Sequence, residues 1–246
     1  MAKIIMLNSS KRHKNTYELL IKISKELEEH DIEIIDIGKY QIEVCTGCEN
    51  CLRNGECHIK DDVLMLQQKM IDADGIVIGT PIHLRQISGL LKVFLDRGCA
   101  WYHRSPLVGK PVLFATTTQV TGTKQAIKYL KDVALQFGMI PCGNISRTLF
   151  TIEEKINTKS LYKFEKFLSK SNIHKYRPTL KQVIEFNTQK VLAMEVLPLD
   201  RKYWQDKGYF DMPYFYESRI SVVKRISGYL YLRMLLFFIR KSKEKH

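Results

Sequence analysis

Five short apolar runs recur along the first 150 residues, each followed by polar or turn-forming residues. The runs are almost continuously apolar, which is typical of parallel strands that are covered on both faces. We therefore predict strands at residues 3–7, 33–37, 75–80, 111–117 and 139–145.

Segments with helical periodicity separate these runs. Apolar residues three or four positions apart form three stripes: Leu20, Ile23 and Leu27; Leu66, Met70 and Ala73; and Ile127, Leu130, Ala134 and Phe137. Caps are expected at Asn15 or Thr16, at Asp61-Asp62 and at Gly138, and a further helix at residues 90–97. This alternation predicts a doubly wound, five-stranded parallel α/β sheet for residues 1–150. Ligands of such sheets bind beyond the carboxyl ends of the strands.

Residues 151–246 do not continue the alternation and are predicted to form a mainly helical extension. Helices are expected at residues 161–168, 180–192 and 226–240, with an aromatic-rich stretch at 203–216. The last helix carries Leu230, Met234, Phe237 and Phe238 among basic residues. Burial of this helix against the core or a second subunit is favoured over peripheral contact with a membrane. The aromatic stretch is interpreted as a lid or a dimer contact.

Composition is that of an ordinary globular chain, with 246 residues of which 45% are hydrophobic and 26% charged. The net charge of +13 is concentrated in residues 151–246, which hold 20 of the 39 Lys and Arg but only 10 of the 26 Asp and Glu. No nucleic-acid-binding fingerprint accompanies this surplus, so nucleic acid is not expected as a partner. The first residues lack a signal-peptide pattern and no apolar run reaches about 18 residues, which predicts a cytoplasmic protein with reduced thiols.

Four of the six cysteines, Cys45, Cys48, Cys51 and Cys57, have the spacing C-x2-C-x2-C-x5-C. This compact spacing is typical of loops that hold a [4Fe–4S] cluster, whereas structural zinc and metal-free thiols are the alternatives. Disulfides between such close neighbours are disfavoured. The two other cysteines, at positions 99 and 142, are predicted to be buried, small apolar residues.

The turn after the first strand is rich in hydroxyl, amide and cationic side chains: Ser9, Ser10, Lys11, Arg12, Asn15 and Thr16. Free N–H groups and the dipole of the following helix favour an anion at this position. The turn has neither the pattern of a nucleotide P-loop nor that of a dinucleotide site, so a phosphomonoester fits best. The alternative is a solvated basic turn.

On these residues the chain resembles the flavodoxin-like NADPH-dependent FMN reductases, and within them the iron–sulfur flavoproteins. The resemblance covers residues 1–147 and rests on the turn at 9–16, the cysteine run with Asp61-Asp62, and the stretches at 79–89 and 91–97. It implies that the turn at 9–16 holds the phosphate of FMN and that the four cysteines bind a [4Fe–4S] cluster. It also implies that the flavin ring is bordered by Pro81, Ile82, His83, Leu84, Arg85 and Gln86, and by Thr116, Thr117, Gln119 and Gly122.

Two positions depart from the usual pattern of this family. His83 stands where the family often has an aromatic residue, and Arg85-Gln86 where it often has Gly-Ser. An inward Arg85 would stabilise the anionic reduced flavin and raise its potential, whereas the alternative is that Arg85 faces solvent. The phosphate turn also lacks the glycine that many members carry.

The resemblance implies an FMN-dependent oxidoreductase that passes electrons between FMN and a [4Fe–4S] cluster, without a catalytic side chain of its own. Its partners would be NAD(P)H, a ferredoxin-like protein or a small acceptor, and a homodimer or higher homo-oligomer is expected. Two other functions remain open. One is a cluster-free NAD(P)H-dependent flavin, quinone or nitro-compound reductase, and the other is a zinc-stapled interaction module.

Overall fold

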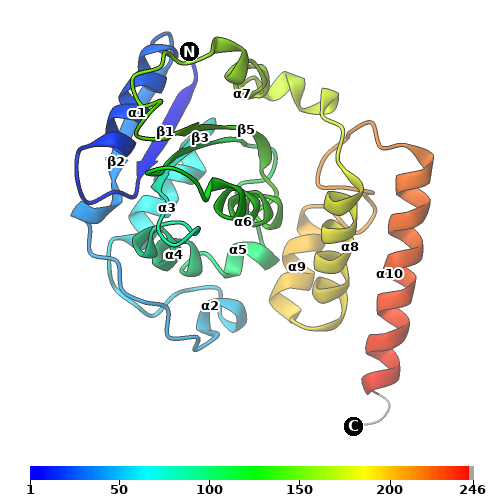
Figure 1. The fold of residues 1–246 in the computed structure, drawn as a ribbon. Helices are drawn as coiled ribbons and strands as arrows, with labels where there is room; N and C mark the ends of the chain where they lie inside the picture. The colour runs from blue at the N-terminus through cyan, green and yellow to red at the C-terminus, as the bar shows by residue number, and fades with distance from the viewer. Residues whose placement is uncertain (244–246) are drawn as a thin grey trace.

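The computed structural model describes residues 1–243, and its centre is a five-stranded parallel sheet with the order β2-β1-β3-β4-β5 (Figure 1). The strands are β1 (Lys3–Asn8), β2 (Asp31–Asp36), β3 (Gly75–Pro81), β4 (Pro111–Thr117) and β5 (Ile140–Arg147). All five predicted strands are confirmed, with ends that differ by two residues at most. Because β1 lies between β2 and β3, the order of the strands reverses beside β1, where such sheets bind their ligands.

Alternate residues of each strand face opposite sides of the sheet, and helices cover both sides. Ile4 and Met6 pack on the side of α1 (Asn15–Lys25). Ile5 and Leu7 pack on the other side, which is covered by α3 (Val63–Asp72), α4 (Gly89–Asp96) and α6 (Thr123–Gln136). Burial on both faces is what the near-continuous apolar runs favour, and the predicted flavodoxin-like, doubly wound fold is confirmed.

One helix beyond residue 150 belongs to the covering of the sheet. α7 (Tyr162–Leu168) packs against β4 and β5 through Phe164, on the same side as α1. α7 therefore packs with the sheet although it lies beyond residue 150. The domain boundary at residue 150 stays a prediction. Short helices occur in the connections: α2 (Asn50–Arg53), α5 (Ala100–His103), η1 (Ile37–Lys39), η2 (Thr158–Ser160) and η3 (Lys170–Lys175).

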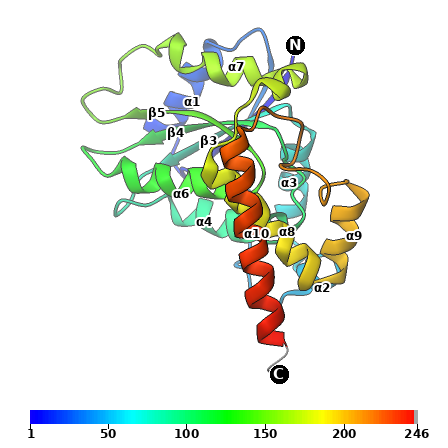
Figure 2. The ribbon, with the colours of Figure 1, turned by 90° about the vertical axis from the view of Figure 1, so that its right-hand side faces the viewer.

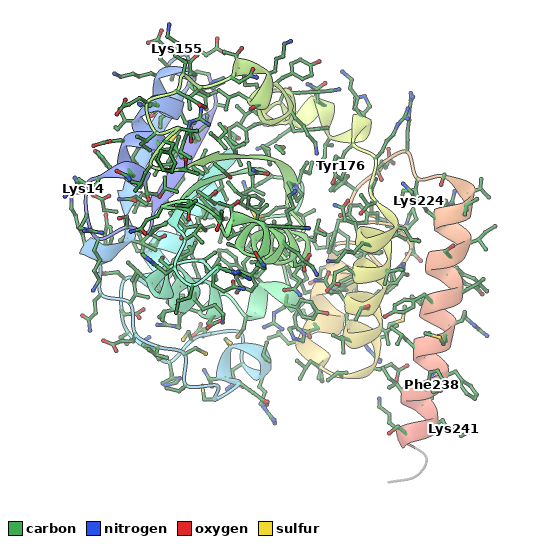
Figure 3. The ribbon with its side chains drawn as sticks, viewed as in Figure 1. Lys14, Lys155, Tyr176, Lys224, Phe238 and Lys241 are labelled. Carbon is green, nitrogen blue, oxygen red and sulfur yellow. The ribbon has the colours of Figure 1, made fainter. Side chains whose placement is uncertain are left out.

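The rest of the extension is helical, as predicted, and lies beside the sheet domain (Figures 1 and 2). It contains α8 (Leu180–Glu195), α9 (Pro198–Asp206) and α10 (Val222–Lys243). The aromatic stretch at 203–216 is buried: Trp204, Tyr214 and Phe215 pack around Phe186 of α8. Tyr176, in the connection between α7 and α8 (Figure 3), joins the same cluster. These rings form a core for the extension.

α10 packs against the rest of the protein along one side only. Gly228 lies so close to α8 that an added Cβ would be 2.6 Å from the side chain of Val183. Leu230, Phe237 and Phe238 are exposed, and Figure 3 shows Phe238 on the side of α10 that is turned away from α8. Among the helices of residues 1–243, none is both long and apolar enough to cross a membrane.

Gly228→Leu is expected to reduce the free energy of unfolding by about 1–3 kcal/mol, because the new side chain would force α10 away from α8. Urea denaturation followed by circular dichroism measures this effect. Gly89→Ala is the control, since an added Cβ at Gly89 meets nothing within 4 Å. Equal stability of Gly228→Leu and the wild type would contradict the close packing of the two helices.

Candidate functional site

A pocket of about 660 Å³, here called the strand-end pocket, opens beyond the carboxyl ends of β1, β3 and β4. Many of the predicted cofactor-binding residues line it: Ser10, Arg12, Asn15, Thr16, Pro81, Ile82, His83, Leu84, Arg85, Thr117 and Gln119. Ser9 and Lys11 line a smaller neighbouring pocket that shares Ser10 and Arg12 with it. Further lining residues were not predicted: Lys14, Thr118, Val120, Thr121 and Leu149. Lys14, Thr118, Val120 and Thr121 lie within or next to the loops that were predicted to bind the cofactor. Leu149 follows β5, and no binding loop was predicted after that strand.

Hydroxyl groups anchor the turn between β1 and α1 to the sheet. Ser9 Oγ donates to the carbonyl oxygen of Gly79 at 2.9 Å and accepts from Ser88 Oγ at 2.9 Å. Thr16 Oγ1 and Thr117 Oγ1 share a hydrogen bond of 2.6 Å, which ties the start of α1 to the end of β4. These hydroxyls are therefore engaged in positioning the loops around the pocket.

The first turn of α1 presents open amide groups. The predicted cap at Asn15 or Thr16 is wrong, because Lys14 occupies the N-cap position and its side chain makes no capping hydrogen bond. Unsatisfied amides and the helix dipole favour an anion at this end of the helix. Arg12 and Lys14 add positive charge at the rim of the pocket. The open amides of α1 and the two cationic side chains therefore fit a phosphate group.

A tight turn places Arg85 at the strand-end pocket. His83 and Gln86 exchange two backbone hydrogen bonds of 2.9 Å, so the two residues between them must reverse the chain. Leu84 and Arg85 do so with φ values of 49° and 65°, in the left-handed region that side chains other than glycine adopt at a cost. Leu84 is 99% exposed as a result. Backbone strain at this position is consistent with a loop that is shaped for binding.

Three predicted cofactor-binding residues line neither the strand-end pocket nor its smaller neighbour. Gln86 closes the turn through its backbone, and Thr116 is buried and bonded to Ser146 Oγ at 2.8 Å. Gly122 has a φ of 102°, and a Cβ there would lie 3.3 Å from Cγ of Arg85. These contacts support the loops, and direct contact of the three residues with a ligand stays a prediction.

The four clustered cysteines meet at one small cavity. Cys45, Cys48, Cys51 and Cys57 all line a space of about 70 Å³, here called the cysteine pocket. None of them is in a disulfide. Cys48 Sγ lies 3.2 Å from Nδ1 of His58, and Cys57 Sγ accepts a hydrogen bond from Nη2 of Arg97 at 3.4 Å. Convergence of four free thiols on one cavity is the arrangement that metal ligation requires.

A fifth cysteine lies at this pocket, contrary to the prediction. Cys99 was predicted to be buried and isolated, but it is exposed and its Sγ lies 3.6 Å from Cys51 Sγ. The prediction is wrong because α5, which follows Cys99, packs against α2 of the cysteine loop. Partial desolvation of the sulfur and the neighbouring Cys51 thiol raise the pKa of Cys99 to about 12. Cys142 is buried in β5, as predicted.

A buried ion pair closes the neck of the cysteine loop. The side chains of Asp61 and Arg97 pair at 0% and 1% exposure, and Asp61 also accepts from the backbone amide of Glu43 at 2.8 Å. Burial alone would raise the pKa of Asp61, but the hydrogen bonds from Arg97, Glu43 and Val63 outweigh it and lower the pKa below its ordinary value. Asp62 occupies the N-cap position of α3 without a capping bond. Asp61 and Asp62 were predicted only as helix caps, and the ion pair by which Asp61 closes the loop was not predicted.

The helical extension also supports the cysteine loop. Asp200 of α9 is fully buried and pairs with His103 Nδ1 at 2.8 Å and with the guanidinium of Arg104. Arg104 in turn donates to the carbonyl oxygens of Cys51 at 2.6 Å and Leu52 at 3.4 Å. Asp200 and Arg104 therefore connect α9 of the extension to the backbone of Cys51 in the cysteine loop. No pattern in the sequence indicated this contact.

The two pockets share no lining residue. Ser88, the N-cap of α4, is bonded to the turn at Ser9, whereas Arg97 and Cys99 follow the other end of α4 and line the cysteine pocket. A helix of eight residues is about 12 Å long. The length of α4 therefore separates the turn at 9–16 from the thiols within one chain.

Comparison with known proteins connects this geometry to a family. The family described as NADPH-dependent FMN reductase matches residues 2–149. An iron–sulfur flavoprotein of Clostridioides difficile is 30% identical over 193 residues, which cover 74% of this chain and 85% of that protein. An iron–sulfur flavoprotein of Archaeoglobus fulgidus is 40% identical over 97 residues, but this match covers 39% of this chain and 48% of that protein. Among solved structures, RosB with a bound formylated riboflavin phosphate has a TM-score of 0.50 and 17% identity over 88% of this chain and 83% of its own. This last likeness concerns the fold alone.

Proposed function

Because the chain belongs to the NADPH-dependent FMN reductase family, in its iron–sulfur flavoprotein branch, we propose that it passes electrons between FMN and a [4Fe–4S] cluster. We place this oxidoreductase in the cytoplasm, where its thiols stay reduced. The observation that carries the proposal is the presence of two pockets in one chain, one with an open helix N-terminus and one with four free thiols.

The strand-end pocket supports the binding of FMN. The phosphate group would be held by the amides of the first turn of α1, with Arg12 and Lys14 balancing its charge. The turn at 83–86 and the residues Thr117 and Gln119 border the remaining space, where the flavin ring would lie. A volume of about 660 Å³ is within the usual range for cofactor sites.

The cysteine pocket supports a cluster rather than a single zinc ion. Zinc–sulfur bonds of about 2.3 Å would hold all four sulfurs within about 4 Å of one another. Among residues 1–243, three or more metal-binding side chains come within 4.8 Å of one another only at Glu29, His30 and Glu165, away from the cysteines. The hydrogen bond from Arg97 to Cys57 Sγ is of the kind that tunes iron–sulfur ligands.

FMN, when bound, exchanges two electrons with a donor such as NAD(P)H, and a [4Fe–4S] cluster exchanges single electrons with a ferredoxin-like protein or a small acceptor. The residues of the chain bind and orient these groups. The Asp61–Arg97 pair and the contact from Asp200 through Arg104 hold the thiols in place. α4 keeps the two sites at a fixed separation.

Anaerobic purification followed by iron, sulfide and flavin analysis tests the proposed function. We expect about four iron and four sulfide per chain together with one FMN, and a broad brown absorption beneath the yellow flavin bands. Flavin without iron would instead identify the cluster-free NAD(P)H-dependent reductase. A colourless protein that contains zinc would identify the interaction module.

Arg85→Gln is expected to lower the midpoint potential of bound FMN by on the order of 30 mV, or about 1.4 kcal/mol for two electrons. The physical reason is that loss of a cation at the pocket makes electron uptake by the flavin less favourable. Spectroelectrochemical titration measures the potential, and Arg53→Gln, on α2 outside the pocket, is the control. An unchanged potential would mean that Arg85 faces solvent.

We expect the chain to form a homodimer or a higher homo-oligomer. Exposed apolar side chains lie at the strand-end pocket, at Leu84, Val120 and Leu149, and in a separate place on α10, at Leu230, Phe237 and Phe238. Such a concentration of exposed apolar surface favours a covering partner. Light scattering coupled to gel filtration measures the oligomeric state.

A further inference from the structure

Cys51 and Cys99 are positioned to react with each other. Cys51 lies in α2, and Cys99 immediately precedes α5, 48 residues later, yet their sulfurs are 3.6 Å apart. A disulfide bond is about 2.05 Å long, so the two sulfurs need to approach by roughly 1.5 Å. Rotation of the two cysteine side chains about χ1 moves their sulfurs by distances of this size.

The backbone around this pair is already held together. Arg104, at the end of α5, donates to the carbonyl oxygens of Cys51 and Leu52, and α2 packs against α5. Arg104 is itself fixed by the buried carboxylate of Asp200. The geometry that brings the two thiols together is therefore a stable part of the fold.

Two of the other thiols at the pocket contact different groups. Cys48 lies against His58, and Cys57 accepts from Arg97. Cys99 is exposed and Cys51 is half-buried, so a small oxidant reaches both. The approach of 3.6 Å and these contacts favour the pair of Cys51 and Cys99 over pairs of Cys51 with Cys48 or Cys57.

We propose that Cys51 and Cys99 form a reversible disulfide when the metal-free chain meets a peroxide. Hydrogen peroxide oxidises the Cys51 thiol to a sulfenic acid and is itself reduced to one water. The Cys99 sulfur then attacks the Cys51 sulfur, so that the S–S bond forms, the S–O bond breaks, and the hydroxyl leaves with the Cys99 proton as a second water. Two thiols and one peroxide thus yield one disulfide and two waters, and a dithiol reductant reverses the change.

The disulfide would close the cysteine pocket to metal. Cys51 would no longer be available as a thiolate ligand, and metal binding by cysteine requires the thiolate. The oxidised, metal-free chain would therefore bind metal again only after the disulfide is reduced. The disulfide itself forms in the chain whether or not the pocket ever carries a cluster.

Peptide mapping of the full chain tests the disulfide directly. The protein is stripped of metal by a chelator under nitrogen, treated with one equivalent of hydrogen peroxide, alkylated and digested without reductant. We expect the Cys51 and Cys99 peptides to be joined and two thiols per chain to be lost. A bond within the run of four cysteines, or no bond at all, would overturn the proposal.

Two variants sharpen the result. Cys99→Ser is expected to show no joined peptide. When it is treated with excess peroxide, two equivalents should oxidise its Cys51 through the sulfenic to the sulfinic acid, which dithiothreitol does not restore. Cys142→Ser, altered at a buried site outside the pocket, should form the same disulfide as the wild type. Iron uptake by the oxidised wild type should require dithiothreitol. Failure of the reduced chain to take up iron would count against the proposed cluster, whereas the peptide map alone decides the disulfide.

Discussion

Replacing Cys48 with alanine is expected to abolish iron binding while FMN stays bound. Loss of one thiolate leaves three of the four predicted ligands, so iron should fall from about four atoms per chain to less than about one. FMN should remain near one per chain, because the strand-end pocket shares no lining residue with the cysteine pocket. Iron and flavin analysis of anaerobically purified protein measures both.

The matched control is Cys142→Ala, which removes a thiol that is buried in β5 and does not line the pocket. This variant should retain both iron and FMN. Retention of iron by Cys48→Ala would remove Cys48 from the ligand set. Simultaneous loss of FMN would mean that the cysteine loop also builds the flavin site.

Asp61→Asn is expected to reduce the free energy of unfolding by about 3–5 kcal/mol, because it leaves the guanidinium of Arg97 buried without its counter-charge. The neck of the cysteine loop should loosen with it, since Arg97 also donates to Glu43 and to Cys57. Urea denaturation of the metal-free proteins measures the stability. Asp96→Asn is the matched control: its pair with Lys92 lies on the exposed face of α4, and its loss should cost less than about 1 kcal/mol.

The effect of Asp61→Asn should depend on pH in a defined direction. The pKa of Asp61 is lowered in the folded protein, so its contribution to stability is complete above the ordinary aspartate value of about 3.9. This contribution is lost as the pH falls through the lowered pKa. The stability difference between wild type and variant should therefore be constant near neutral pH and shrink in acid. A difference that grows in acid would contradict the ionised pair.

The sheet could be predicted because each of its elements is encoded locally. The run at 75–80 is apolar at nearly every position, and both of its faces are buried in the structure. The turn at 9–16 combines cations and hydroxyls directly before a helix, and the structure places most of them at one pocket. The spacing of Cys45, Cys48, Cys51 and Cys57 likewise requires only a short loop, and all four residues line one small cavity.

The missed features depend on contacts between distant parts of the chain. Cys99 and Cys51 are 48 residues apart, and Asp200 and Arg104 are 96 residues apart. The partner of a buried charge or thiol is set by which helices pack together, and no local pattern records that choice. The cap predicted at Thr16 was wrong for the same reason, since its hydroxyl is bonded to Thr117 in another element. Asp61 does accept from the amide of Val63 at the start of α3, but its pair with Arg97 depends on α4 and was not predicted.

The sequence by itself determined the five strands, most of the helices, the compact cysteine spacing and the basic, hydroxyl-rich character of the turn at 9–16, because these features depend on periodicity and on neighbouring residues. Only the tertiary structure decided that Cys99 faces Cys51, that α9 supports the cysteine loop, and that α4 stands between the two pockets. It also decided that the aromatic rings of the extension form a core. Burial and ion pairing arise where elements far apart in the chain pack together, so they appear only in the folded molecule.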